Sequence, residues 1–227
     1  SYGAAPAMVI GATDRDIAIG EVAASGSKFG LIIDGTISGN GVYTGVNGNG
    51  LVIGGRGGDV TIANGMGVAG KITASSSGGT ATALRIGEGA TIPEVRVSGT
   101  IGAEGATATA IRIDAGSSVD TIRNSGTLGA KATSSAGSAT AIVDASGNVT
   151  QIENSGAISA TGAAADSNRN VAIDVSANTS GVTLRQTEVA AGITAPSIAG
   201  DVRFGSGNDV FEIADGSVAG KVSFGAG

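Results

Sequence analysis

The 227-residue sequence has no histidine, no cysteine and no tryptophan, and it contains only four phenylalanines and two tyrosines. Without imidazole or thiol side chains, the chain cannot form a Ser-His-Asp or Cys-His nucleophilic system, or a zinc site of the His and Cys type. The sequence therefore predicts a protein that is not an enzyme and that needs no cofactor. The absence of cysteine also fits export through an oxidising compartment.

Charge and long apolar runs are scarce as well. Only 14% of the residues are charged, the net charge is −6, and the 13 Lys and Arg residues are scattered singly. This distribution excludes the basic patch expected of a nucleic-acid-binding protein or of a polybasic membrane-binding protein. No apolar run approaches the roughly 20 residues that a membrane-spanning helix needs, so we expect no transmembrane helix in this chain.

Glycine is abundant instead, at 41 of the 227 residues or about 18%, against a usual share of roughly 7%. A hydrophobic content of 41% argues against a disordered chain. Collagen is excluded because there are only three prolines and glycine keeps no three-residue period. The composition therefore predicts a folded chain with many tight turns and a core of small aliphatic side chains.

An internal repeat organises the chain. The sequence SGTIGA at 98–103 recurs as SGTLGA at 125–130 and as SGAISA at 155–160. The aliphatic residue of this motif belongs to a longer series, with steps of 35, 29, 27, 30 and 35 residues. The members of the series are Ile37, Ile72, Ile101, Leu128, Ile158 and Ile193.

Two further alternating apolar segments repeat in phase with this series. One lies at 51–53, 84–86, 111–113, 142–144 and 173–175, and the other at 60–62, 95–97, 119–122, 149–152 and 182–184. Short alternating segments separated by Gly, Ser, Asn and Asp are typical of β-strands. Three short strands in each period of roughly 30 residues predict an all-β parallel solenoid of about seven coils.

The glycines of the repeat fall at its corners, at Gly99, Gly126 and Gly156. A corner that recurs in every coil needs glycine for an unusual φ angle and for close stacking. We divide the chain into an N-terminal cap or irregular first coil at 1–30, solenoid coils at 31–200, and a terminal Gly-Asn-Asp coil at 201–227. The last coil is expected to be truncated within a repeat.

The segments 122–128 (IRNSGTL), 152–158 (IENSGAI) and 200–211 (GDVRFGSGNDVF) resemble the I-x-N-x-G-x-I coils of bacterial autotransporter passenger domains of type V secretion. The resemblance implies a right-handed parallel β-helix that is exported across the outer membrane to the cell surface. It also implies an outer-membrane β-barrel beyond the C-terminus of the precursor. Such passengers serve as adhesins, aggregation factors, toxins or proteases. The resemblance covers roughly residues 30 to 227 and is more specific for architecture than for activity.

Two coil positions suggest polar sites. Asn124 and Asn154 occupy the same position of successive coils, which predicts an inward-facing amide ladder with a structural role. The segment 205–211 (GSGNDVF) also fits the calcium-binding unit of a β-roll, with Asn208 and Asp209 as the candidate ligands. Only this copy of the unit is complete, so a tight Gly-Asn-Asp corner is the preferred interpretation. A calcium-stabilised β-roll module remains an alternative.

Three aspartates, Asp114, Asp144 and Asp174, are spaced 30 residues apart and could form an acidic column. Together with Arg112 or Arg123, such a column would suit a β-helical enzyme that acts on polysaccharides. However, the coils differ by one residue in length, so that Asp174 follows its strand isoleucine at the position where Arg112 follows its own. Solvated residues at strand ends are the preferred interpretation, and the enzyme is the alternative.

Other charged and polar residues are interpreted as solvent-exposed. Four arginines on outward positions have acidic neighbours, which predicts cross-coil ion pairs of small individual value. The N-x-S/T sequences at Asn148 and Asn178 are interpreted as exposed turns. The arginines are Arg85, Arg96, Arg112 and Arg123, and the acidic residues are Glu88, Glu94, Glu104 and Asp120.

These features together predict a non-enzymatic structural or adhesive protein of the bacterial cell surface. Its function would be adhesion, self-association, or assembly into an extracellular filament or layer. The expected partners are further copies of the chain, or another cell-surface protein or glycan. Stacked coils would supply a rigid spacer, and the polar ladders on its faces would supply the contacts.

Overall fold

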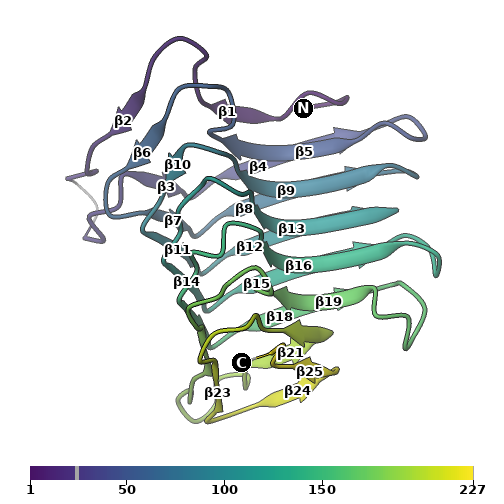
Figure 1. Ribbon diagram of the computed structural model, residues 1–227. Helices are drawn as coiled ribbons and strands as arrows, with labels where there is room; N and C mark the ends of the chain where they lie inside the picture. Colours follow the sequence, from purple (N-terminus) through teal and green to yellow (C-terminus); the bar gives the residue numbers. More distant parts are fainter. Residues whose placement is uncertain (24–25, 227) are drawn as a thin grey trace.

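The computed structural model describes residues 1–23 and 26–226, and every regular element in that part of the chain is a β-strand. The strands stack in parallel into a solenoid of about six turns, which runs from the N-terminus at the top of Figure 1 to the last strands at the bottom. The predicted solenoid is confirmed and is consistent with a right-handed parallel β-helix. Residues 24 and 25 of the predicted N-terminal segment, and residue 227 of the predicted last coil, lie outside the described residues.

Three long sheets form the walls of the solenoid, numbered I to III in the order in which each turn enters them. Sheet I contains β4 (Thr36–Gly41), β8 (Lys71–Ser76), β12 (Thr100–Gly105), β15 (Thr127–Ala132), β18 (Ala157–Thr161), β21 (Ser197–Ala199) and β24 (Ser217–Ala219). Sheet II contains β1 (Met8–Ile10), β5 (Gly48–Ile53), β9 (Thr80–Ile86), β13 (Thr107–Ile113), β16 (Ser138–Asp144), β19 (Asn170–Asp174), β22 (Asp201–Arg203) and β25 (Val222–Ser223). Sheet III contains β3 (Leu31–Ile33), β7 (Met66–Val68), β11 (Glu94–Val97), β14 (Thr121–Asn124), β17 (Gln151–Asn154), β20 (Thr183–Gln186) and β23 (Val210–Ile213).

The register of sheet I confirms the aliphatic series from Ile37 to Ile158 and corrects its last member. The residue that pairs with Ile158 is Ile198, whereas the predicted Ile193 lies in a loop and is 62% exposed. Residues 187–196 separate β20 from β21, where the preceding turn has only residues 155–156 between β17 and β18. The register steps are therefore 35, 29, 27, 30, 40 and 20 residues, which gives six steps in place of the seven coils predicted from a uniform period.

The segment 60–62 was predicted to align with 95–97, and this prediction is wrong. The neighbour of β11 in sheet III is β7, with Met66 opposite Val95. Val60–Ile62 instead forms β6 at the centre of a small fourth sheet, between β2 (Ile17–Ile19) and β10 (Ala90–Thr91). This turn contains two alternating apolar segments, and its sequence does not distinguish which of them continues sheet III.

The first residues of the chain extend the stack. Tyr2 bridges Asn40 on β4, β1 pairs with β5, and β2 pairs with β6. The chain thus passes over sheet I, sheet II and the small sheet before β3 enters sheet III. Because these pairings are parallel and in register, this segment follows the path that the later turns follow.

The interior is filled by columns of small aliphatic side chains. One column on sheet II consists of residues that are all 0% exposed, and each such burial contributes about 1.5–3 kcal/mol. The aromatic residues gather at the C-terminal end, where the ring of Phe204 stacks on that of Phe224 at 4.9 Å and lies 6.1 Å from that of Phe211. The sheet II column contains Leu51, Leu84, Ile111, Ile142 and Ile173.

Candidate functional site

The outer face of sheet I is uniformly small and polar. A shallow groove of about 420 Å³ lies over this face. The Thr73 hydroxyl donates to the Ser38 hydroxyl across neighbouring turns at 3.0 Å, and Ser75 donates to the Asn40 side chain at 2.8 Å. The outward column that lies along the groove contains Ser38, Thr73, Gly102, Gly129 and Ser159. Because these side chains are short, another flat surface can approach the backbone of the sheet closely.

The predicted amide ladder lies inside the corner between sheets III and I. Asn124 Nδ2 donates to Asn154 Oδ1 at 2.8 Å, and Asn154 Nδ2 donates to Gln186 Oε1 at 3.3 Å. All three side chains are buried. Gln186 was not predicted as a member, although its register position opposite Asn154 and its amide chemistry were the available signals. The buried amides are satisfied by one another and by backbone groups, which fits a structural role.

The corner glycines lie just after this ladder, and the structure corrects the reason for them. Gly99, Gly126 and Gly156 do not have positive φ angles. A Cβ atom at these positions would lie 2.1, 2.1 and 2.2 Å from the carbonyl oxygen of the corner glycine in the preceding turn. Glycine is therefore required because two turns of backbone meet there without room for a side chain.

Asp114 lies on the outer face of sheet II between two stacked arginines. Arg85 Nε donates to Asp114 Oδ2 and Arg112 Nε donates to Asp114 Oδ1, both at 2.6 Å. Arg85 and Arg112 face each other in register on β9 and β13. The carboxylate of Asp114 therefore neutralises part of a basic surface.

The three aspartates spaced 30 residues apart do not form a column. Asp144 pairs with Ile113, and Asp174 pairs with Val143, so the register places each aspartate at a different position along its strand. Asp144 is only 1% exposed. Its carboxylate accepts hydrogen bonds from Ser146, Gly147 and Val149, while Asp174 lies on the outer side with Arg203. The acidic column that the polysaccharide-enzyme alternative needed is not assembled.

The outer face of sheet III carries a series of ion pairs. Glu94 binds Arg96 at 2.7 Å and lies 3.5 Å from Arg123, which also contacts Glu153 in the next turn. Farther along, Arg185 Nε donates to Glu212 at 2.7 Å. On sheet I, Glu104 pairs with Lys131, and of the two N-x-S/T sequences predicted to be exposed, Asn178 is fully buried.

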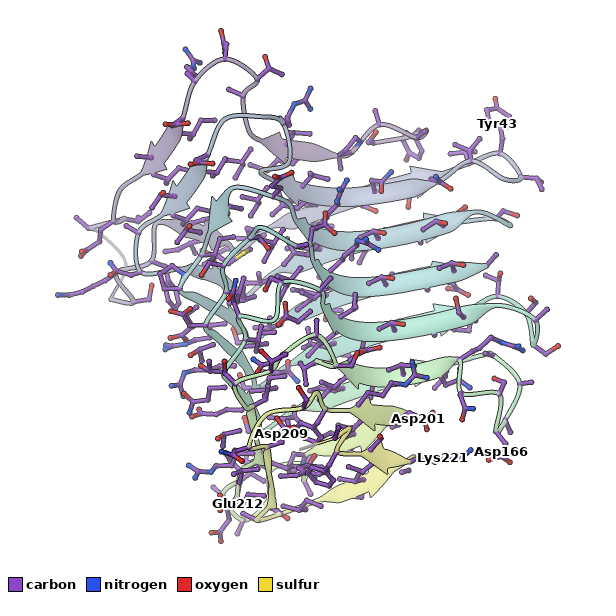
Figure 2. The ribbon with its side chains drawn as sticks, viewed as in Figure 1. Tyr43, Asp166, Asp201, Asp209, Glu212 and Lys221 are labelled. Carbon is purple, nitrogen blue, oxygen red and sulfur yellow. The ribbon has the colours of Figure 1, made fainter. Side chains whose placement is uncertain are left out.

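The candidate calcium ligands lie at the C-terminal end of the stack, where Figure 2 shows Asp209 beside β23. Asp209 Oδ1 accepts a hydrogen bond from the backbone N–H of Val182 at 2.8 Å, which links the corner to the preceding turn. Asp209 Oδ2 is buried without a hydrogen-bond partner among the described residues, and Asn208 is exposed. Within the described part of the chain, no three acidic, His or Cys side chains are grouped so that they could hold a metal ion.

Comparison with known proteins finds no matching family model, no similar curated protein and no similar solved structure. In the part of the chain that the structure describes, no helix is long and apolar enough to cross a membrane. The fold and its three outer faces define a parallel β-solenoid protein. Its candidate functional surface is the small polar face of sheet I.

Proposed function

We propose that this protein is a structural β-solenoid that associates with further copies of itself through the outer face of sheet I. The observation that supports this proposal is the column of hydroxyl-bearing residues and glycines along that face, with a shallow groove above it. Sheets II and III differ, because arginine and acidic side chains project from their outer faces. Two copies of sheet I could approach closely and exchange hydroxyl hydrogen bonds along several turns.

The resemblance to autotransporter passenger domains gives this association a setting. The I-x-N-x-G-x-I segments at 122–128 and 152–158 fall on the ladder and the glycine corner of a parallel solenoid. We therefore propose export to a bacterial cell surface, where a rigid rod would act in adhesion or in assembly of a surface layer. Protease treatment of intact cells that express the complete gene tests this location. Digestion in intact cells is expected, and protection that ends only after lysis would contradict it.

Two glycines allow a sharp test of the association itself. An added Cβ would meet nothing closer than 3.9 Å at Gly102 and 3.5 Å at Gly129, so substitution there leaves the fold undisturbed. Sedimentation velocity over a range of concentrations should show oligomers of the wild-type protein and only monomers of a Gly102→Arg, Gly129→Arg variant. Thr183→Arg, on the outer face of sheet III, is the matched control and should associate like the wild type.

Circular dichroism spectra must show that each variant keeps its β structure. A wild-type protein that stays monomeric at the highest concentration would contradict the proposal. Equal association of the wild type and the double arginine variant would remove sheet I as the contact face.

A further inference from the structure

A second groove, of about 380 Å³, crosses sheet II near the N-terminal end of the solenoid. Along it lie Val9 on β1, Val52 on β5 and Arg85 on β9, which occupy one outward column in register. Pro6 and Arg56 also line the groove. It therefore combines an apolar surface with cationic groups, in a volume within the roughly 300–1,000 Å³ range of small-ligand sites.

The groove differs in charge from the rest of the protein. Among the described residues that line it, Arg56 and Arg85 are the charged ones, whereas the whole chain has a net charge of −6. The side chain of Arg56 makes no hydrogen bond or ion pair with any described residue. Two guanidinium groups in a groove without a carboxylate favour an anionic ligand.

The two arginines also have donors to offer. A guanidinium group carries five N–H donors, and Arg85 uses its Nε to bind Asp114 at 2.6 Å while 48% of its side chain remains exposed. The other N–H groups of Arg85 have no partner among the described residues. The nearby negative charge of Asp114 favours a singly charged head group over a dianion.

We propose that this groove binds a small organic anion, with a carboxylate head on Arg56 and Arg85 and a short aliphatic body on Pro6, Val9 and Val52. The head would gain charge-assisted hydrogen bonds from the guanidinium groups. The body would cover apolar side chains that are partly exposed to solvent. This activity is separate from self-association, because it uses a different sheet.

Titration of the isotope-labelled protein with hexanoate, followed by NMR, tests the proposal. Saturable shifts are expected at the amides of Val9, Val52 and Arg85. Acetate has the head without the body, and hexanol has the body without the head, so each should bind at least about tenfold more weakly. Absence of saturable shifts with hexanoate, or equal binding of hexanol, would overturn the proposal.

The pair of arginines on Asp114 supplies a matched control. Arg85→Gln and Arg112→Gln each remove a 2.6 Å ion pair with Asp114, but only Arg85 lines the groove. We expect Arg85→Gln and Arg56→Gln to weaken hexanoate binding about tenfold each, and Arg112→Gln to change it less than about twofold. Equal weakening by Arg85→Gln and Arg112→Gln, or no weakening by Arg56→Gln, would reject this site. Circular dichroism verifies that the variants are folded.

Discussion

Two corners of each turn are closed in opposite ways. Between sheets III and I, the backbone of one turn lies directly against the next, and glycine is required at Gly99, Gly126 and Gly156. Between sheets II and III, polar side chains fill the corner, such as Asp144 in one turn and Asn178 in the next. The first corner therefore repeats in sequence, whereas the second repeats only in shape.

The difference has a physical cause. A contact that excludes a Cβ atom accepts one residue type, so it leaves the same letter in every turn. A corner whose backbone groups need hydrogen-bond partners accepts several polar residues. Asp144 accepts from the N–H groups of Ser146 and Val149, whereas Asn178 donates to the carbonyl groups of Gly147 and Val149.

Gly126→Ala tests the glycine corner and should have the largest effect. Its new Cβ would lie 2.1 Å from the Gly99 carbonyl oxygen, and only movement of the backbone could relieve this overlap. We expect a loss of unfolding free energy of about 4 kcal/mol or more, measured by urea denaturation. Gly129→Ala, where a Cβ meets nothing closer than 3.5 Å, is the control and should change stability by less than about 0.5 kcal/mol. Equal stability of the two variants would contradict the steric explanation.

Asp144→Ala tests the polar corner. It leaves the N–H groups of Gly147 and Val149 without their acceptor in a buried setting, which should cost about 3 kcal/mol of unfolding free energy. Asp144→Asn keeps one acceptor oxygen and should lose about half as much. The same urea experiment measures both. If alanine were tolerated as well as asparagine, the carboxylate would not be what closes this corner.

These two corners show what could be predicted from the sequence. The solenoid and the register of 101, 128 and 158 follow from the steric motif, which tolerates little variation. The position after Ile158 could not be predicted, because Ile193 and Ile198 both suit the period and only the inserted loop at 187–196 separates them. The Asp114 clamp was also missed, since its partners depend on a register shift of one residue between turns.

The candidate faces were predictable to different degrees. Outward alternation on each strand identified the arginines as exposed, because alternate residues of a strand point to opposite sides. Their partners were only partly predictable, since Arg123 contacts Glu94 and Glu153 from the turns on either side of it. The groove on sheet II depends on Pro6, Arg56 and Arg85, which lie far apart in the sequence and meet only through stacking.

Asn154→Ala sharpens the comparison, because Asn154 is a polar residue within the glycine corner. It accepts from Asn124 at 2.8 Å and donates to Gln186 and to the carbonyl group of Ser197. Its loss should lower the unfolding free energy by about 2 kcal/mol, less than Gly126→Ala, since a smaller side chain leaves the close backbone contact intact. Urea denaturation of the two variants in parallel checks this order. A greater loss for Asn154→Ala would show that the ladder, and not the glycine contact, determines this corner.

Arg185→Ala gives the baseline against which both corners are judged. Arg185 and Glu212 pair at 2.7 Å on the outer face of sheet III, but about half of each side chain is exposed, at 47% and 48%. Solvent and salt screen such a pair, so its removal should lower the unfolding free energy by less than about 1 kcal/mol. A double-mutant cycle with Glu212→Ala, measured at low and at high salt, isolates this coupling, which should shrink as salt rises. A coupling as large as the loss in Asp144→Ala would mean that outer ion pairs, and not the buried corners, hold the turns together.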